Sequence, residues 1–237
     1  PSYNQYMQQS LMTALYDQLT RYWAVDIRDQ APNQELARAG SADRSLATID
    51  LSDASDTISY ELVRAAFSWH PGFLDFLEAT RSYEVSLPDG GSFFLRKFAS
   101  MGSALTFPVE TMVFMTVVVM GMCIQDGDLS RGRALKHFHS RKVRVYGDDI
   151  VVPSSYYQSV VENLARYGFK VNRAKSYCNG FFRESCGEDW FSSHDVTPIY
   201  VRREVDNEHL GNDSLQSLVS FHNQFFEKNH SGLTTDL

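Results

Sequence analysis

The sequence predicts an α+β protein in which an antiparallel sheet is backed by helices. Two pairs of short apolar runs are each joined by a turn-forming sequence, as in a β-hairpin. Stretches of helical periodicity lie between these runs, in the order strand, helix, hairpin, buried helix, hairpin, helix, strand. No internal repeat or linker interrupts residues 1–237, so one domain is expected.

Composition limits the function classes. The 237 residues are 43% hydrophobic and 22% charged, which excludes a disordered chain, a collagen and a disulfide scaffold. A formal net charge of −7 excludes a basic nucleic-acid coat, so any nucleic-acid site must be local or held by metal ions. Three irregularly spaced cysteines, Cys123, Cys178 and Cys186, predict free thiols in a reducing compartment such as the cytoplasm.

The first 70 residues predict a helix, a strand and a second helix. Apolar residues recur at helical spacing over residues 2–22, and a polar loop is expected from there to Gly40. Leu46–Leu51 is a short, mostly apolar strand. The polar cluster after it offers N-caps for a helix to about Phe67, which places Asp50 where a strand ends.

The middle of the chain predicts a hairpin and a buried helix. Strand-like runs at 83–87 and 92–96 flank the turn sequence Pro88-Asp89-Gly90-Gly91. A helix with almost no polar face follows, from Pro108 to about Cys123. Its apolar stretch is shorter than the roughly 20 residues that cross a bilayer, so we expect a core helix and no membrane span.

The last part predicts a second hairpin over 141–152, with Asp148 and Asp149 at its tip. A helix over 154–167 ended by Gly168 and a strand at 169–171 follow. Further predicted elements are short strands at about 181–191 and 199–202 and a final helix at about 214–227.

Three carboxylates, those of Asp50, Asp148 and Asp149, can meet in such a sheet. Hard oxygen donors without His or thiolate favour Mg²⁺ or Mn²⁺, and two such ions suit phosphoryl or nucleotidyl transfer. A Gly-Asp-Asp sequence is alternatively an ordinary hairpin turn. The apolar flanks favour the metal site, because buried like charges are costly unless a cation holds them.

The motifs resemble those of viral RNA-dependent RNA polymerases. Tyr146–Asp149, Ile49–Asp56 and Met101–Phe107 are similar to motifs C, A and B, and they resemble most narrowly the replicase catalytic beta subunit of single-stranded RNA bacteriophages, the leviviruses, typified by phage Q-beta. Further segments similar to that family are Asn33-Gln34, Phe182–Gly187 and Asp195–Pro198. The similarity covers nearly the whole chain.

This resemblance implies a polymerase palm with partial fingers, residues 71–100 forming a hairpin insert of the fingers type. It implies that Asp50 and Asp148 bind two Mg²⁺ or Mn²⁺ ions and that Asp149 assists. An RNA 3′-hydroxyl would attack the α-phosphate of a ribonucleoside triphosphate and release pyrophosphate. Residues 1–40 hold no basic cluster for a triphosphate, so we expect a fragment of a longer replicase that polymerises poorly alone.

The resemblance also implies a nucleotide and RNA site, comprising Ser55, Asp56, Gly102, Ser103, Thr106 and Gly147. Ser55 and Asp56 would sense the ribose 2′-hydroxyl, although Asp56 could instead cap a helix. Polymerases of eukaryotic positive-strand viruses carry Asn where Glu110 stands, which leaves the sugar sensor open.

Two basic residues have two interpretations each. Lys175 falls in the region of the family's motif D, where it would protonate the leaving pyrophosphate; otherwise it is a solvated turn lysine. Arg183 would contact RNA phosphate or form a salt bridge with Glu184.

Other polar groups give weaker signals. Neither the His137/His139 pair nor the set of Cys178, Cys186 and His194 has the spacing of a compact zinc site, so surface histidines and buried thiols are expected. One basic stretch either contacts RNA backbone or is the charge row of an edge strand, and it comprises Arg131, Arg133, Lys136, Arg141, Lys142 and Arg144.

The expected partners are template and product RNA and ribonucleoside triphosphates, in the cytoplasm of an infected bacterium and with no membrane. The resemblance adds host elongation factors Tu and Ts and a ribosomal protein. Two rival functions stay open: a non-catalytic RNA-binding or assembly remnant of the palm fold, and a metal-dependent phosphohydrolase. The latter is disfavoured because no His or further acid is in place to activate water.

Overall fold

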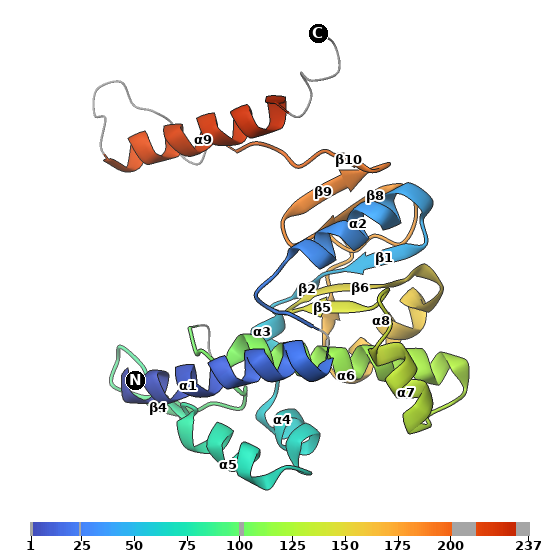
Figure 1. The fold of residues 1–237 in the computed structure, drawn as a ribbon. Helices are drawn as coiled ribbons and strands as arrows, with labels where there is room; N and C mark the ends of the chain where they lie inside the picture. Colours follow the sequence, from blue (N-terminus) through green and yellow to red (C-terminus); the bar gives the residue numbers. More distant parts are fainter. Residues whose placement is uncertain (1, 24, 100–101, 201–211, 231–237) are drawn as a thin grey trace. The chain divides into compact units, whose positions relative to one another are not determined.

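The computed structural model describes residues 2–23, 25–99, 102–200 and 212–230. The chain divides into two compact units, residues 1–195 and 196–237, and each is described by itself. The first unit holds small antiparallel sheets and packed helices, so the α+β class is confirmed (Figure 1).

A helix replaces the polar loop expected before Gly40. After α1 (Ser2–Gln18) and a π-helical turn, η1 (Leu19–Trp23), the chain forms α2 over Ala31–Asp43. Pro32 lies in the first turn of this helix, a position that suits proline. Gly40 lets α2 approach the sheet: a Cβ there would lie 2.9 Å from the Cβ of Leu46. The loop prediction was wrong because α2 buries small residues rather than a large apolar stripe.

The central sheet has the strand order β1-β6-β5 and is antiparallel throughout. Its strands are β1 (Leu46–Ile49), β6 (Asp149–Pro153) and β5 (Arg144–Tyr146), so the predicted second hairpin is confirmed. The predicted strand at 46–51 divides at Asp50, beyond which β2 (Leu51–Ser52) pairs with β7 (Lys170–Val171). Asp50 therefore lies at a junction between two sheets.

The helix predicted up to Phe67 is two helices, α3 (Ala54–Thr57) and α4 (Tyr60–Phe67). Extended backbone at Ile58 separates them, and the Ser59 side chain accepts a hydrogen bond from the Leu62 amide to begin α4. After α5 (Pro71–Thr80), the first predicted hairpin is present as β3 (Glu84–Ser86) and β4 (Ser92–Phe94).

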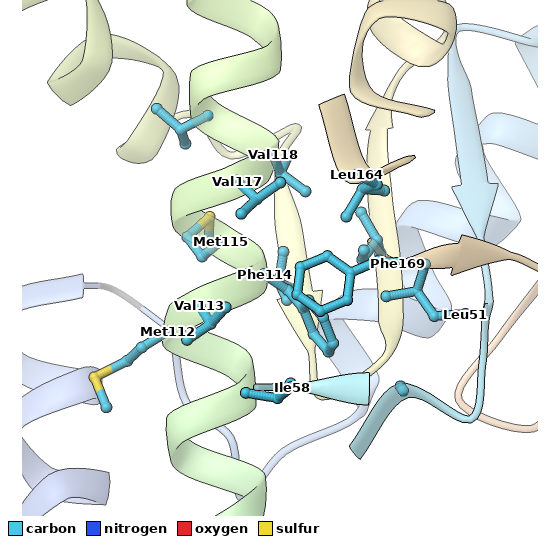
Figure 2. Close-up of a cluster of buried hydrophobic side chains, with 14 of the residues drawn as sticks. Leu51, Ile58, Met112, Val113, Phe114, Met115, Val117, Val118, Leu164 and Phe169 are labelled. Atoms are coloured by element: carbon cyan, nitrogen blue, oxygen red, sulfur yellow. The ribbon is translucent and has the colours of Figure 1, made fainter. Parts of the chain in front are cut away.

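Helix α6 (Thr106–Asp126) is the core of the first unit. Length and composition would let it cross a membrane, but 78% of its apolar window is buried in the protein, as in a core helix. Phe114 packs edge to face on Phe169, with ring centroids 4.9 Å apart (Figure 2). The central sheet lies between α6 and α2 (Figure 1).

Helix α8 (Tyr157–Arg166) packs directly on α6. Gly121 permits the close approach, since a Cβ there would lie 3.1 Å from atoms of Ser159, Val160 and Asn163. The Asn163 side chain donates to the Val117 carbonyl at 2.8 Å. Helix α7 (Arg131–Phe138) precedes β5, and a short 3-10 turn, η2 (Ser154–Tyr156), leads into α8.

The first unit ends in a sheet of order β10-β9-β8, formed by β8 (Phe182–Ser185), β9 (Glu188–Phe191) and β10 (His194–Asp195). Of the strand expected at 199–202, residues 199 and 200 have no regular structure and 201–202 lie outside the described residues. The second unit contains α9 (Asn212–His230), which confirms the last predicted helix.

Candidate active site

The turn of the β5–β6 hairpin consists of Gly147 and Asp148, because Tyr146 and Asp149 form the last pair of the ladder. Gly147 has φ +58° and is buried, and its amide donates to Thr111 Oγ1 at 3.0 Å. A Cβ at Gly147 would lie 2.5 Å from the Phe107 ring. Glycine is thus required here, and the hairpin tip is held on the first turns of α6.

Asp50 is brought to this tip by strand pairing, since Ile49 pairs with Ile150. A turn after β7 holds it: Asn172 Nδ2 donates to Asp50 Oδ2 at 2.9 Å, and the Asn172 amide donates to the Asp50 carbonyl at 2.9 Å. The Asp50 amide donates to Ser176 Oγ at 3.1 Å. Burial raises the pKa of Asp50, Asn172 opposes this, and the charge of Asp148 raises it further.

Asp149 faces a third segment, the β8–β9 turn. Its Oδ1 accepts from the Cys186 amide at 3.1 Å and from Ser185 Oγ at 3.3 Å. Burial raises the pKa of Asp149, and the charges of Asp148 and Asp50 add to the rise. Helix α2 supports this contact, since Gln34 Nε2 donates to the Cys186 carbonyl at 3.2 Å.

Two glutamates that were not among the predicted site residues interact electrostatically with the three aspartates. The acidic cluster thus consists of Asp50, Glu110, Asp148, Asp149 and Glu184. Glu110 on α6 is 6% exposed; burial, with the charge of Asp148, raises its pKa to about 8. Its Oε2 is buried and has no hydrogen-bond partner among the described residues. Burial and the charges of Asp149 and Asp50 raise the pKa of Glu184 to about 7. The sequence signal that could have identified Glu110 is its place as a single acid in an otherwise apolar helix.

The donor chemistry of this cluster fits Mg²⁺ or Mn²⁺. Its carboxylates are hard oxygen ligands. Burial and neighbouring carboxylates raise the pKa values of Asp50, Asp149 and Glu110, so a cation would stabilise their charged forms. Among the described residues, no three His, Cys, Asp or Glu side chains are grouped closely enough to hold an ion by themselves. Mg²⁺ commonly uses one or two carboxylates and completes its shell with water and substrate phosphate.

Lys175 lies in the turn after β7, exposed to solvent, and its charge lowers the pKa of both Asp50 and Glu184. Its exposed ammonium therefore acts electrostatically on the acidic cluster, and its role as a proton donor stays a prediction. The amide of Lys175 donates to the Asn172 carbonyl at 3.1 Å, so the same turn carries both residues.

Arg183 serves neither of its predicted roles. It is fully buried, and its guanidinium donates to five backbone carbonyls, those of Leu46, Cys178, Asn179, Gly180 and Phe182. The contact with RNA phosphate and the salt bridge with Glu184 are wrong, because the junction of β1 and β8 presents these carbonyls to the side chain. Arg183 is a structural link between the two sheets.

The predicted nucleotide-binding residues do not lie together at one place. Gly147 lies at the carboxylates, whereas Gly102 and Ser103 line a cavity of about 220 Å³ whose lining includes none of the three aspartates. Ser103 Oγ donates to Gln8 Oε1 at 3.1 Å. Thr106 begins α6.

Ser55 and Asp56 lie in α3, where Asp56 forms an ion pair with Lys97 at 2.6 Å. The N-cap position of α3 is Asp53, so the interpretation of Asp56 as the cap is wrong. Asp53 has φ +53° and makes no side-chain capping bond. Asp56 lies one turn further on, where its carboxylate pairs with the Lys97 ammonium.

His137 is buried rather than at the surface, which corrects the prediction. Its Nε2 lies 2.6 Å from Asp126 Oδ2, because the end of α7 packs against the end of α6. His139 is exposed. The three cysteines are free thiols, buried or partly buried as predicted.

The basic stretch is dispersed. Arg133 lies 3.5 Å from carboxylates of both Asp126 and Asp128. Arg144 is half-buried on β5, which is an edge strand of the central sheet. Whether these residues contact RNA stays a prediction.

The family model described as RNA replicase, beta-chain matches residues 1–220. The chain belongs to this family. It is 40% identical over 205 residues to the RNA-directed RNA polymerase subunit beta of Enterobacteria phage SP, covering 86% of this chain and 33% of that protein. It is 38% identical over 205 residues to the corresponding subunit of Escherichia virus Qbeta, covering 86% and 32%. The similarity to the RNA-directed RNA polymerase beta chain of Escherichia phage MS2 is 37% over 207 residues, covering 87% and 35%.

This replicase chain thus spans about one third of the length of the relatives it matches. The resemblance seen in the motifs is confirmed at the level of the family. The match also includes α2 and the β8–β9 turn, the two elements around Asp149 that the predicted site did not include.

Proposed function

We propose that this chain is the catalytic core of an RNA-directed RNA polymerase, a palm with partial fingers that adds ribonucleotides to an RNA 3′-hydroxyl on a template. The observation that carries the proposal is the buried β5–β6 tip, which places Asp148 within electrostatic reach of Asp50 at the end of β1. The names of the related phage proteins support the same activity.

Asp50 and Asp148 would hold two Mg²⁺ or Mn²⁺ ions. Bound there, the ions supply activation of the attacking hydroxyl and neutralise charge on the leaving pyrophosphate. Asp149 assists by linking β6 to the β8–β9 turn through Cys186 and Ser185, which keeps the hairpin tip in place. Water and substrate phosphates would complete the shells of the ions.

The remaining site residues have roles in substrate handling. Lys175 is a proton donor for the leaving pyrophosphate, since its ammonium is exposed and acts on Asp50. Gly102, Ser103 and Thr106 contact the nascent base pair and ribose, and Gly147 belongs to the same nucleotide and RNA site. Ser55 and Asp56 sense the ribose 2′-hydroxyl, with Lys97 holding the Asp56 carboxylate in place.

The proposed partners are template and product RNA, ribonucleoside triphosphates and the host factors that the resemblance implies: elongation factors Tu and Ts and a ribosomal protein. The proposed site of action is the cytoplasm of an infected bacterium. Because the chain spans one third of its relatives, residues beyond it would supply the rest of the RNA channel.

The test is pyrophosphate release by the full-length replicase that contains this chain, with Mg²⁺, primed RNA and all four ribonucleotides. Release that needs both template and ribonucleotides, and that Asp50→Asn abolishes, supports the polymerase. Release from nucleotides without template supports the phosphohydrolase. RNA binding without any release, host factors present, supports the non-catalytic remnant.

A further inference from the structure

The turn that follows β7 makes hydrogen bonds to Asp50 in addition to those that pair β2 with β7. Four hydrogen bonds join the two segments at Asp50. The Asn172 side chain donates to the carboxylate, the Asn172 amide donates to the Asp50 carbonyl, the Asp50 amide donates to Ser176 Oγ, and Ser176 Oγ donates to the Asp50 carbonyl at 3.4 Å. Ser176 Oγ also donates to the Asn172 carbonyl at 2.8 Å, which closes the turn on itself. This group of residues, Asn172–Ser176 with Asp50, is called the Asp50 clamp below.

Within the Asp50 clamp, the Asn172 side chain uses both of its ends. Its amide nitrogen donates to Asp50 Oδ2 at 2.9 Å, and its Oδ1 accepts from the Ala174 amide at 3.2 Å. The bond from the Ala174 amide fixes the plane of the Asn172 side-chain amide, so its Nδ2 points at Asp50 in a defined direction. Among the described residues no hydrogen bond is made to the other carboxylate oxygen, Oδ1 of Asp50.

We propose that Asn172 is a positioning residue for Asp50: it holds one carboxylate oxygen of Asp50 and thereby leaves the other to a divalent ion. This inference rests on the proposed function, which makes Asp50 a metal ligand. A carboxylate held by a neighbouring donor loses less freedom on binding an ion, and such outer contacts set the orientation of the ligand. The same turn carries Lys175, so Asn172 also fixes the separation between Asp50 and the proposed proton donor.

The variant that isolates this role is Asn172→Ser. A serine hydroxyl can still accept from the amide two residues on, which preserves the turn, but it is too short to reach Asp50. The backbone bonds of the Asp50 clamp are unaffected by the substitution. Asn179→Ser is the matched control, because Asn179 is an exposed asparagine a few residues further along.

The experiment titrates this chain with Mn²⁺ and follows the loss of the free-ion electron paramagnetic resonance signal. Circular dichroism and thermal unfolding verify that each variant is folded. Asp50→Asn is included to show which binding depends on the proposed ligand. We expect Asn172→Ser to weaken the Asp50-dependent binding about 10- to 100-fold, the usual effect of removing an outer-shell partner, and Asn179→Ser to leave it unchanged.

The outcomes separate the two levels of the proposal. If Asp50→Asn loses Mn²⁺ binding while Asn172→Ser binds as the unmodified chain does, the positioning role is wrong and the metal site stands. If the unmodified chain has no Asp50-dependent binding, the metal site is wrong and the role of Asn172 with it. In the full-length replicase, Asn172→Ser should lower kcat while the KM for ribonucleotides changes little; a rise in KM alone contradicts the assignment.

Discussion

Hairpins β3–β4 and β5–β6 are built alike, each with three antiparallel residue pairs and a turn containing glycine and aspartate. They differ in burial. Every residue of β3 and β4 is exposed, including Phe94 at 76%, whereas Val145 and Ile150 of the second hairpin are buried against the core.

The acids at the two turns differ accordingly. Asp89 Oδ1 accepts from the Gly91 amide at 3.0 Å and so stabilises its own turn. Asp148 lies on a buried tip, where its charge raises the pKa of Asp50, Asp149 and Glu110. The turn sequence alone does not distinguish the two hairpins; the packing of α6 and β1 around one of them makes it a candidate site.

The largest expected difference in stability between the two hairpins comes from substitutions in their strands. Ile150→Ala removes a side chain that is 1% exposed, and we expect a loss of about 2–5 kcal/mol in the free energy of unfolding. Phe94→Ala should change it by less than about 0.5 kcal/mol, as at most exposed positions. Denaturant titration measures both values. Equal losses would show that the two hairpins contribute alike to the core.

The turn glycines provide a second contrast. Gly147→Ala adds left-handed strain, about 1–2 kcal/mol, and an overlap with Phe107, for a total of about 2–4 kcal/mol. At Gly90, φ is +86° and a Cβ would have no other atom within 4 Å, so Gly90→Ala should lose only the strain. Chemical denaturation distinguishes them; a larger loss at Gly90 would contradict the packing described for the buried tip.

The acidic surroundings of the buried hairpin predict a pH dependence without divalent cations. Glu110 loses its proton near 4.5 when unfolded and near 8 when folded, so the unfolded chain holds fewer protons between these values. The contribution of Glu110 to the free energy of unfolding is therefore fully present below pH 4.5 and decreases as the pH rises toward 8, by about 1.4 kcal/mol per pH unit. Glu110→Gln should reduce the slope of the curve measured in EDTA between pH 5 and 8, and Glu184, whose pKa is raised to about 7, keeps part of the slope below pH 7. An unchanged slope would mean that Glu110 is charged in the folded chain.

The smallest effect is expected for the ion pair beside the exposed hairpin. Lys97 and Asp56 have side chains that are 28% and 50% exposed, so Lys97→Met should lower the free energy of unfolding by less than about 1 kcal/mol. The difference should shrink in 1 M salt, because surface charges are screened. Thermal unfolding at two salt concentrations checks this, and a loss that is unaffected by salt would indicate packing of the lysine stem instead.

Local signals were sufficient for much of the fold. Turn sequences predicted both hairpins, and continuous apolar character predicted the burial of α6. Helix α2 was missed because it buries small residues such as Gly40 and Ala37, which produce no strong periodicity. The break at Ile58 was missed because it depends on pairing with the segment around Phe98, whose amide donates to the Ile58 carbonyl.

For the site, sequence reasoning supplied the three aspartates but not the contacts around them. Asn172, Ser176 and Cys186 lie more than 30 residues from the acids they contact, and only the tertiary structure brings them together. For Arg183, sequence reasoning predicted a contact that is absent. A basic residue in a family motif suggested binding to RNA phosphate, whereas its guanidinium donates hydrogen bonds to backbone carbonyls.

The central claim is that the buried hairpin tip is the catalytic site, and one comparison of matched variants tests it most directly. Mg²⁺-dependent ribonucleotide incorporation on primed RNA is measured for the full-length replicase carrying Asp148→Asn or Asp89→Asn. The predicted result is loss of incorporation to background for Asp148→Asn and unchanged incorporation for Asp89→Asn, with both variants folded. Full incorporation by Asp148→Asn would contradict the claim.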